Sequence, residues 1–190
     1  MPAPGQGTGN PLIRRIPHLL SGAASGNSAV IALPTTGGEP DAIRAAAAVR
    51  RAGGVVVAAG GCFDVLHAGH VRLLDQARRL GDHLVVCLNG DRSVRRLKGA
   101  HRPLNTAADR AAVLRGLGCV DGVVTFDDDT PCAALRAIRP DLFVKGSDYE
   151  GVELAEREVM AEWGGQVVLL PVVDGHSTTQ LIATAVAAAG

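Results

Sequence analysis

Short runs of consecutive apolar residues, rich in valine, alternate along the chain with segments that have a helical pattern. The runs are expected to form five buried strands, at residues 55–59, 84–88, 122–126, 142–144 and 167–170. The helical segments are expected at residues 41–51, 71–80, 107–116, 131–138, 153–163 and 178–188. Strands that are apolar throughout are typical of a parallel sheet covered on both faces. The pattern therefore predicts an α/β fold with a Rossmann-like, doubly wound sheet of five parallel strands and right-handed crossovers.

The first 38 residues differ in composition from the rest of the chain. They are rich in Gly, Pro, Ser and Thr, and they contain two short apolar islands at residues 16–20 and 29–33. We expect residues 1–38 to form a low-complexity extension that is partly disordered. The remaining residues, 39–190, are enough for one domain with a well-buried core, because 47% of the chain is hydrophobic.

Charge and composition exclude several classes of partner. Nineteen basic and 19 acidic residues give a net charge of zero, so we expect no binding to nucleic acid or to an anionic membrane. Aromatic residues make up 3% of the chain, too few for stacking on single-stranded nucleic acid. The four cysteines are far apart, and no signal peptide or membrane span is recognisable. We therefore expect a cytoplasmic protein with free thiols.

Residues 60–70, with the sequence GGCFDVLHAGH, follow the first expected strand. In a parallel α/β sheet, ligands bind beyond the carboxyl ends of the strands. Gly60 and Gly61 would let the chain turn tightly and bring backbone N–H groups close to a phosphate. His67 and His70 are three residues apart, so on one helical turn they can face the same ligand. The segment is therefore a candidate phosphate site.

Two other interpretations of the histidine pair are open. Each histidine could be an ordinary polar residue at the start of a helix. The HxxH spacing could also bind zinc, but no third cysteine, histidine or acidic ligand stands at a recognisable spacing, so we predict no protein-bound metal. The three aspartates at residues 127–129 could likewise bind a metal, but an acidic start to the helix that follows explains them more simply.

The whole segment matches the GxFDxxHxGH pattern of the cytidylyltransferase-like nucleotidyltransferase superfamily, and the chain resembles this family from about residue 55 to residue 182. Within the family it is similar to the nucleotidyltransferase part of bifunctional ADP-heptose synthases and to stand-alone D-glycero-β-D-manno-heptose 1-phosphate adenylyltransferases. The other segments that carry the resemblance are residues 89–93, 95–99, 102–105, 129–131, 140–149 and 174–179.

The resemblance implies transfer of AMP from ATP to a sugar 1-phosphate, with Mg²⁺ accompanying the nucleotide, by a protein that forms a homodimer. The alternative is a CTP-dependent cytidylyltransferase acting on glycerol 3-phosphate or another polyol or sugar phosphate. Such an enzyme usually carries an RTEGISTT segment near its end, where residues 172–179 of this chain read VVDGHSTT, without the arginine. Ser147 replaces a glycine of the heptose enzymes, and His176 stands where a cysteine is common. These departures leave the identity of the sugar open, and the sequence does not separate ATP, CTP and GTP.

The resemblance also implies roles for individual residues. The catalytic residues would be His67, His70, Lys98 and Lys145. The acceptor would be bound by Asp64, Lys98 and Arg110. The nucleotide would be bound by both histidines, Lys145, Gly61, Cys62, Phe63, Gly69, Asn89, Asp91, Ser177, Thr178 and Thr179. No covalent intermediate is needed, because an oxygen of the sugar phosphate attacks the α-phosphorus in line and pyrophosphate leaves.

Four of these residues have a structural alternative. Lys98 is expected in a flexible loop and could be a solvated surface lysine. Lys145 could pair with Asp148, and Arg110 could brace the loop of Lys98 instead of touching phosphate. Asp64 is expected to hold its loop through backbone N–H groups and not to act as a base, because a carboxylate that faces a triphosphate would repel it.

Overall fold

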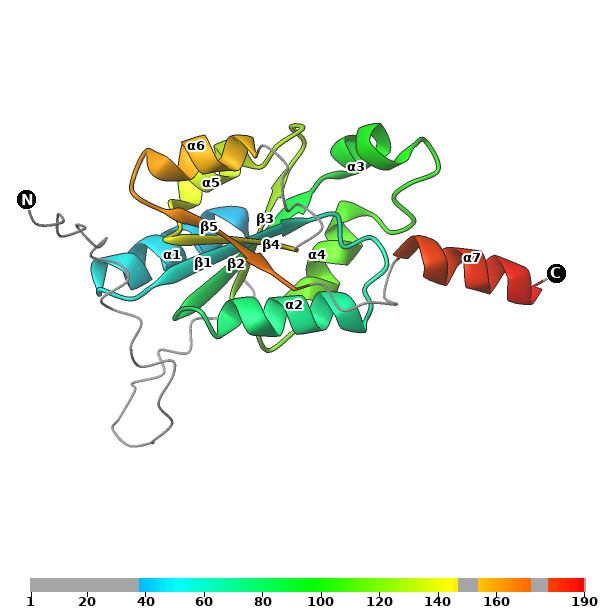
Figure 1. The fold of residues 1–190 in the computed structure, drawn as a ribbon, viewed down its shortest axis with the longest axis horizontal. Helices are drawn as coiled ribbons and strands as arrows, with labels where there is room; N and C mark the ends of the chain where they lie inside the picture. The colour runs from blue at the N-terminus through cyan, green and yellow to red at the C-terminus, as the bar shows by residue number, and fades with distance from the viewer. Residues whose placement is uncertain (1–37, 147–153, 172–177, 190) are drawn as a thin grey trace, which may run out of the picture. The chain divides into compact units, whose positions relative to one another are not determined.

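The computed structural model describes residues 38–146, 154–171 and 178–189. The division between residues 1–38 and the rest stays a prediction, because nearly all of that extension lies outside the described residues. The strands form one five-stranded sheet in the order β3-β2-β1-β4-β5, and every neighbouring pair is parallel (Figure 1). This confirms the predicted fold class. The strand bounds are β1 (Val56–Gly61), β2 (His83–Asn89), β3 (Gly122–Phe126), β4 (Leu142–Gly146) and β5 (Gln166–Leu170).

Helices cover both faces of the sheet (Figure 1). One face packs against α1 (Glu39–Arg51), α5 (Cys132–Ile138) and α6 (Ala155–Ala161). The opposite face packs against α2 (Ala68–Arg78) and α4 (Ala107–Arg115). The other described helices are α3 (Asp91–Lys98) and α7 (Thr178–Ala189). No described helix is long and apolar enough to cross a membrane.

Strand β1 shows why its run of apolar residues folds in this way. Val56 and Ala58 belong to the core cluster on one face, whereas Val57 and Ala59 belong to the cluster on the other, and all four are fully buried. Successive side chains of a strand point to opposite faces, so a strand buried on both sides must be apolar at every position.

Three aspartates close the amino-terminal edge of the sheet. Asp82, Asp121 and Asp141 each lie just before a strand, and each carboxylate accepts a backbone N–H at or next to the start of the neighbouring strand. The donors are Val55 to Asp82 (2.7 Å), Leu84 to Asp121 (2.8 Å) and Val56 to Asp141 (2.8 Å). Because these N–H groups have partners within the fold, the carboxyl edge is the one left for ligands.

The strand order creates a switch point between β1 and β4. The chain leaves β1 through α2 on one face of the sheet, and it leaves β4 toward α6 on the opposite face. In parallel α/β sheets, ligands bind beyond the carboxyl ends of the strands at such a switch point. Residues 60–70 and Lys145 are therefore brought to one place by the topology.

Helix α3 was not predicted. Its buried side chains are only Ser93 and Val94, so the hydrophobic repeat is too short to reveal a helix. Charge gives a better signal, because Asp91 lies in the first turn and basic residues fill the last turn, as the helix dipole favours. Gly99, with a φ of +98°, ends the helix.

Candidate functional site

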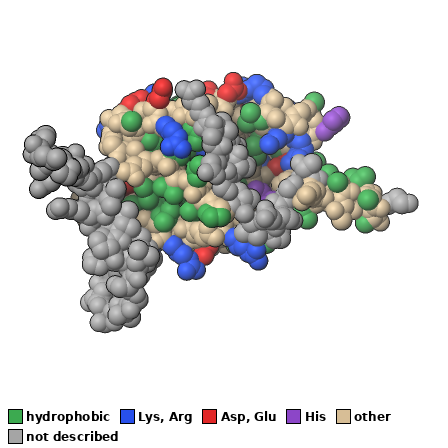
Figure 2. All heavy atoms as spheres, in the orientation of Figure 1, with side chains coloured by type: hydrophobic (Ala, Val, Ile, Leu, Met, Phe, Trp, Pro, Cys, Tyr) green, Lys and Arg blue, Asp and Glu red, His purple; other side chains and the backbone are tan. Residues whose placement is uncertain are grey.

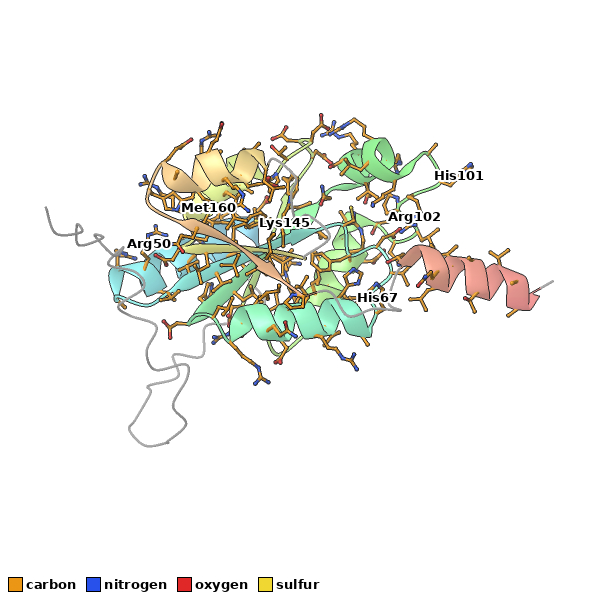
Figure 3. All side chains as sticks on the ribbon, viewed as in Figure 1. Arg50, His67, His101, Arg102, Lys145 and Met160 are labelled. Carbon is orange, nitrogen blue, oxygen red and sulfur yellow. The ribbon has the colours of Figure 1, made fainter. Side chains whose placement is uncertain are left out.

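The two histidines lie side by side where α2 begins. His67 caps the helix in an extended conformation, and His70 lies in the first turn. Their rings are stacked, with centroids 3.8 Å apart, and the ring of Phe63 lies 5.1 Å from that of His70. Figure 3 shows His67 at this end of α2, next to the edge where β1 ends. The two rings thus lie together, and their contact with one ligand stays a prediction.

His70 is uncharged at neutral pH. Burial, reinforced by the neighbouring His67, lowers the pKa of His70 to about 4. Within the described part of the chain, no hydrogen-bond partner reaches its buried Nδ1. The site therefore presents a neutral imidazole beside the N-terminus of a helix, whose positive dipole end suits an anionic phosphate.

The turn after β1 differs from the expected one. Gly60 and Gly61 are the last residues of the strand, so the first strand does not end at Ala59. Glycine is needed here for space, since a Cβ at Gly60 would lie 2.9 Å from the ring of Phe143, and one at Gly61 would lie 2.9 Å from the ring of Phe63. The chain turns at Phe63 itself, whose φ of +44° is strained for a bulky residue.

Asp64 anchors the segment between α3 and α4. Its side chain is 1% exposed, and its carboxylate accepts the backbone N–H groups of Leu104 (2.7 Å) and Asn105 (3.1 Å) and the Nε–H of Arg102. Burial alone would raise the pKa of Asp64, but the hydrogen bonds from Asn105, Arg102 and Leu104 lower it. The structure thus supports the loop-holding role, with the carboxylate turned toward protein donors. Contact with the acceptor stays a prediction.

Arg110 also acts as a brace. Its side chain is 1% exposed and reaches four places: the carbonyl oxygens of Asn105 (3.0 Å), Cys62 (2.5 Å) and Asn89 (2.8 Å), and the carboxylate of Asp91 (2.8 Å). The guanidinium therefore ties the ends of β1 and β2 to the starts of α3 and α4. Of the two predicted roles, bracing is the one that the geometry favours.

Asn89, one of the predicted nucleotide ligands, is buried. Its Nδ2 donates to Ser93 Oγ (3.0 Å), and that hydroxyl donates to the backbone oxygen of Asp128 (3.0 Å). This chain of hydrogen bonds fixes the start of α3 against the end of β3.

Cys62, another predicted nucleotide ligand, is half-buried. Burial raises the pKa of its thiol, although the positive charges of Lys98 and Arg110 act in the opposite direction.

The aspartates at residues 127–129 are explained by ion pairs. Arg92 of α3 binds Asp127 (2.8 Å), and Arg96 binds Asp129 (2.8 Å). Both arginines were overlooked, because their partners lie more than 30 residues away in the sequence. The acidic run therefore holds α3, and an acidic helix start alone does not account for it. Among the described residues, no group of three His, Cys, Asp or Glu side chains could hold a metal ion.

The two candidate lysines have different surroundings. Lys98 is exposed and is the last residue of α3, so its expected place in a flexible loop is wrong. Lys145 is only 14% exposed, at the carboxyl end of β4, and its Nζ lies 2.7 Å from Oε1 of Glu156 in α6. The suggested partner Asp148 lies outside the described residues. Sequence reasoning missed Glu156, because an acidic residue in the first turn of a helix has an ordinary explanation in the helix dipole.

The start of α7 is only partly described. Thr178 is the first residue of the helix, and its hydroxyl donates to the carbonyl oxygen of Val65 at 3.4 Å, a long hydrogen bond. This contact joins the start of α7 to the segment that carries the histidines. Ser177 and the side chain of Thr179 lie outside the described residues, so their predicted roles stay predictions.

Comparison with known proteins points to one family. A family model described as cytidylyltransferase-like matches residues 58–182. The chain is 57% identical over 162 residues to the bifunctional protein HldE of Streptomyces coelicolor, covering 85% of this chain and 34% of that protein. It is 51% identical over 123 residues to the bifunctional protein HldE of Hyphomonas neptunium, covering 65% of this chain and 25% of that protein. The chain thus spans about a quarter to a third of the length of these relatives.

A solved structure agrees with the fold. The crystal structure of the lipopolysaccharide core biosynthesis protein from Thermoplasma volcanium GSS1 matches with a TM-score of 0.54 and 26% sequence identity, over 63% of this chain and 97% of that one. The range matched by the family model includes the stacked histidines, the Asp64 anchor and the carboxyl ends of all five strands. The chain belongs to the cytidylyltransferase-like family.

Proposed function

We propose that this chain transfers AMP from ATP to a sugar 1-phosphate, with D-glycero-β-D-manno-heptose 1-phosphate as the acceptor, and releases pyrophosphate. The observation that carries the proposal is the stacked pair of His67 and His70, placed at a helix N-terminus beside the switch point of the sheet. The high identity to HldE proteins and the resemblance to heptose 1-phosphate adenylyltransferases support this acceptor. The CTP-dependent alternative has less support, because the arginine of its usual RTEGISTT segment is missing.

The reaction needs charge stabilisation more than proton transfer. An oxygen of the acceptor phosphate forms a bond to the α-phosphorus, while the bond from that phosphorus to the bridging oxygen breaks and its electrons leave with pyrophosphate. The acceptor is already ionised, so no base has to remove a proton. The protein must hold two anions in line and neutralise the negative charge that builds on the transferring and leaving oxygens.

His67, His70 and Lys145 surround the proposed triphosphate position. The histidines and the first N–H groups of α2 would donate to the phosphate chain, and His70 would contact the α-phosphate. Lys145, held by Glu156 at the end of β4, would add a positive charge from the β4 side of the switch point. Mg²⁺ would be held mainly by the phosphates of the nucleotide, and it would neutralise part of their charge.

The substrates can be tested directly. The purified protein would be incubated with Mg²⁺, each of ATP, CTP and GTP, and either heptose 1-phosphate or glycerol 3-phosphate, while pyrophosphate release is followed. We expect the highest kcat/KM for ATP with heptose 1-phosphate. Faster turnover of CTP with glycerol 3-phosphate would favour the alternative, and no turnover with any pair would refute nucleotidyl transfer to these acceptors.

We also propose that the protein is a homodimer with α7 in the interface. This helix carries no charged residue, and Leu181 and Val186 are 44% and 69% exposed (Figure 2). An apolar helix that faces water usually marks a surface for association. The half-exposed strand β5 offers a further apolar surface on the same molecule.

Light scattering after size-exclusion chromatography would test this arrangement. We expect a dimer for the wild-type protein and a monomer for the Leu181→Glu, Val186→Glu double variant, because the introduced charges would have to be buried. The control is Val113→Glu, which changes a valine on α4 whose exposure of 53% lies between those of Leu181 and Val186. A double variant that stays dimeric would exclude α7 from the interface.

A further inference from the structure

Arg102 is a fixed cation with unused donors. Its Nε–H is bound by the buried carboxylate of Asp64, and its side chain is 18% exposed. A guanidinium has five N–H groups, and within the described ranges no partner other than Asp64 binds this side chain. The outer edge of the guanidinium, with its two Nη groups, is therefore free to bind a ligand at a position that Asp64 sets.

The strand order places Arg102 on a definite side of the site. The segment from α3 to α4 follows β2, which lies next to β1 on the side away from β4. Lys145 comes from β4 on the opposite side, and the histidines lie between the two. Figure 3 shows Arg102 and His67 at the same edge of the sheet. Lys98 belongs to the Arg102 side, because it is the last residue of α3, and the segment that follows α3 carries Arg102.

We propose that Arg102, with Lys98, forms the subsite for the phosphate of the acceptor. The planar guanidinium can bind two phosphate oxygens at once, and Lys98 can add a mobile point charge. Asp64 would then be a positioning residue that holds Arg102 in place. This subsite rests on the proposed nucleotidyl transfer and names the group that recognises its second substrate.

The geometry of in-line transfer explains why the ligand is the acceptor and not the nucleotide. The attacking oxygen and the leaving pyrophosphate must lie on opposite sides of the α-phosphorus. The triphosphate would occupy the N-terminus of α2 and extend toward the carboxyl end of β4, where Lys145 lies. The second anion must approach from the remaining side, and it needs positive charge of its own there, which Arg102 and Lys98 supply.

Steady-state kinetics of Arg102→Gln would test this subsite. We expect the KM for the sugar phosphate to rise on the order of 10- to 100-fold, while the KM for ATP changes less than about twofold. The matched control is Arg95→Gln, which removes the same charge from an exposed position on α3. This control should leave both KM values nearly unchanged, so it separates direct contact from the general field of positive charge.

Arg102→Lys covers the case in which the glutamine variant does not fold. Lysine keeps the charge beside Asp64 but lacks the planar fork, so we expect a folded protein with a smaller rise in the acceptor KM. An unchanged acceptor KM in both folded variants would overturn the proposal. A rise in the KM for ATP alone would also overturn it, because Arg102 would then belong to the nucleotide site.

If the proposed nucleotidyl transfer is wrong, the result differs from the one expected when only the Arg102 subsite is wrong. The wild-type protein would then show no turnover with any substrate pair. In that case inorganic phosphate would be titrated calorimetrically into the protein saturated with ATP and Mg²⁺. Binding by the wild-type and Arg95→Gln proteins that is lost in Arg102→Gln would support the anion subsite without the reaction, and equal binding by all three would overturn it.

Discussion

Replacing His70 by alanine is expected to lower kcat for nucleotidyl transfer by about 10² to 10³, with a small change in the KM for ATP. Its imidazole is neutral, half-buried and stacked on His67 at the start of α2, so it can donate a hydrogen bond where contact with water is reduced. A donor of this kind is worth most when negative charge builds on the α-phosphate in the transition state. Initial rates of pyrophosphate release would measure the effect.

The exposed His101 provides the matched control for this substitution. His101→Ala removes an imidazole from the loop after α3 and should leave kcat unchanged within about twofold. His70→Asn should recover part of the lost rate, because an amide can still donate. If His70→Ala turns over as fast as the wild-type protein, His70 has no part in the transfer.

The His70→Asn variant also tests whether the pKa of His70 is lowered in the folded protein. An unfolded histidine gains a proton near pH 6.5, whereas His70 in the folded protein does so only near pH 4. Between these values the unfolded state binds more protons, so the wild-type protein loses stability as the pH falls through this window. The urea midpoint of the wild-type protein should therefore fall relative to that of His70→Asn from pH 6.5 to 4. A constant difference would show that the pKa is not lowered.

The sheet and the position of the site could be predicted because both depend on local patterns. Strands that are buried on two faces are apolar through their central positions, and residues 56–59 of β1 and 84–88 of β2 meet this condition. The carboxyl edge follows from the parallel topology, and residues 60–70 begin at the carboxyl end of the first strand. The closeness of His67 and His70 could be predicted from their spacing at the start of α2, whereas the stacking of their rings could not.

The contacts that arrange the site could not be predicted, because they join residues far apart in the sequence. Arg102 meets Asp64 across 38 residues, and Lys145 meets Glu156 across a segment with several acidic candidates. The amphipathic repeat of α3 is too short to indicate a helix, so the sequence pattern predicts a loop at Lys98. For Arg102 and Lys145 the choice of partner depends on tertiary packing, which no periodic pattern in the sequence predicts.

The largest loss of stability is expected for Arg110→Met, which should lower the free energy of unfolding by about 3–5 kcal/mol. The substitution keeps a long apolar stem but removes every donor, so the buried carbonyl oxygens of Cys62 and Asn89 lose their partner. Asp91 also loses its ion pair at the start of α3. Urea unfolding at neutral pH, followed by circular dichroism, would measure the change.

Two comparisons separate bracing from phosphate binding at Arg110. Arg115→Met changes an arginine on the same helix for which no ion pair is present among the described residues, so it should cost no more than about 0.5 kcal/mol. Arg110→Lys keeps the charge but cannot reach four partners at once, and it should still lose about 1–3 kcal/mol. A phosphate ligand would behave in the opposite way, because lysine would preserve much of the binding and methionine would raise KM with little loss of stability. A raised KM with little loss of stability would contradict the bracing role and would support direct binding of phosphate by Arg110.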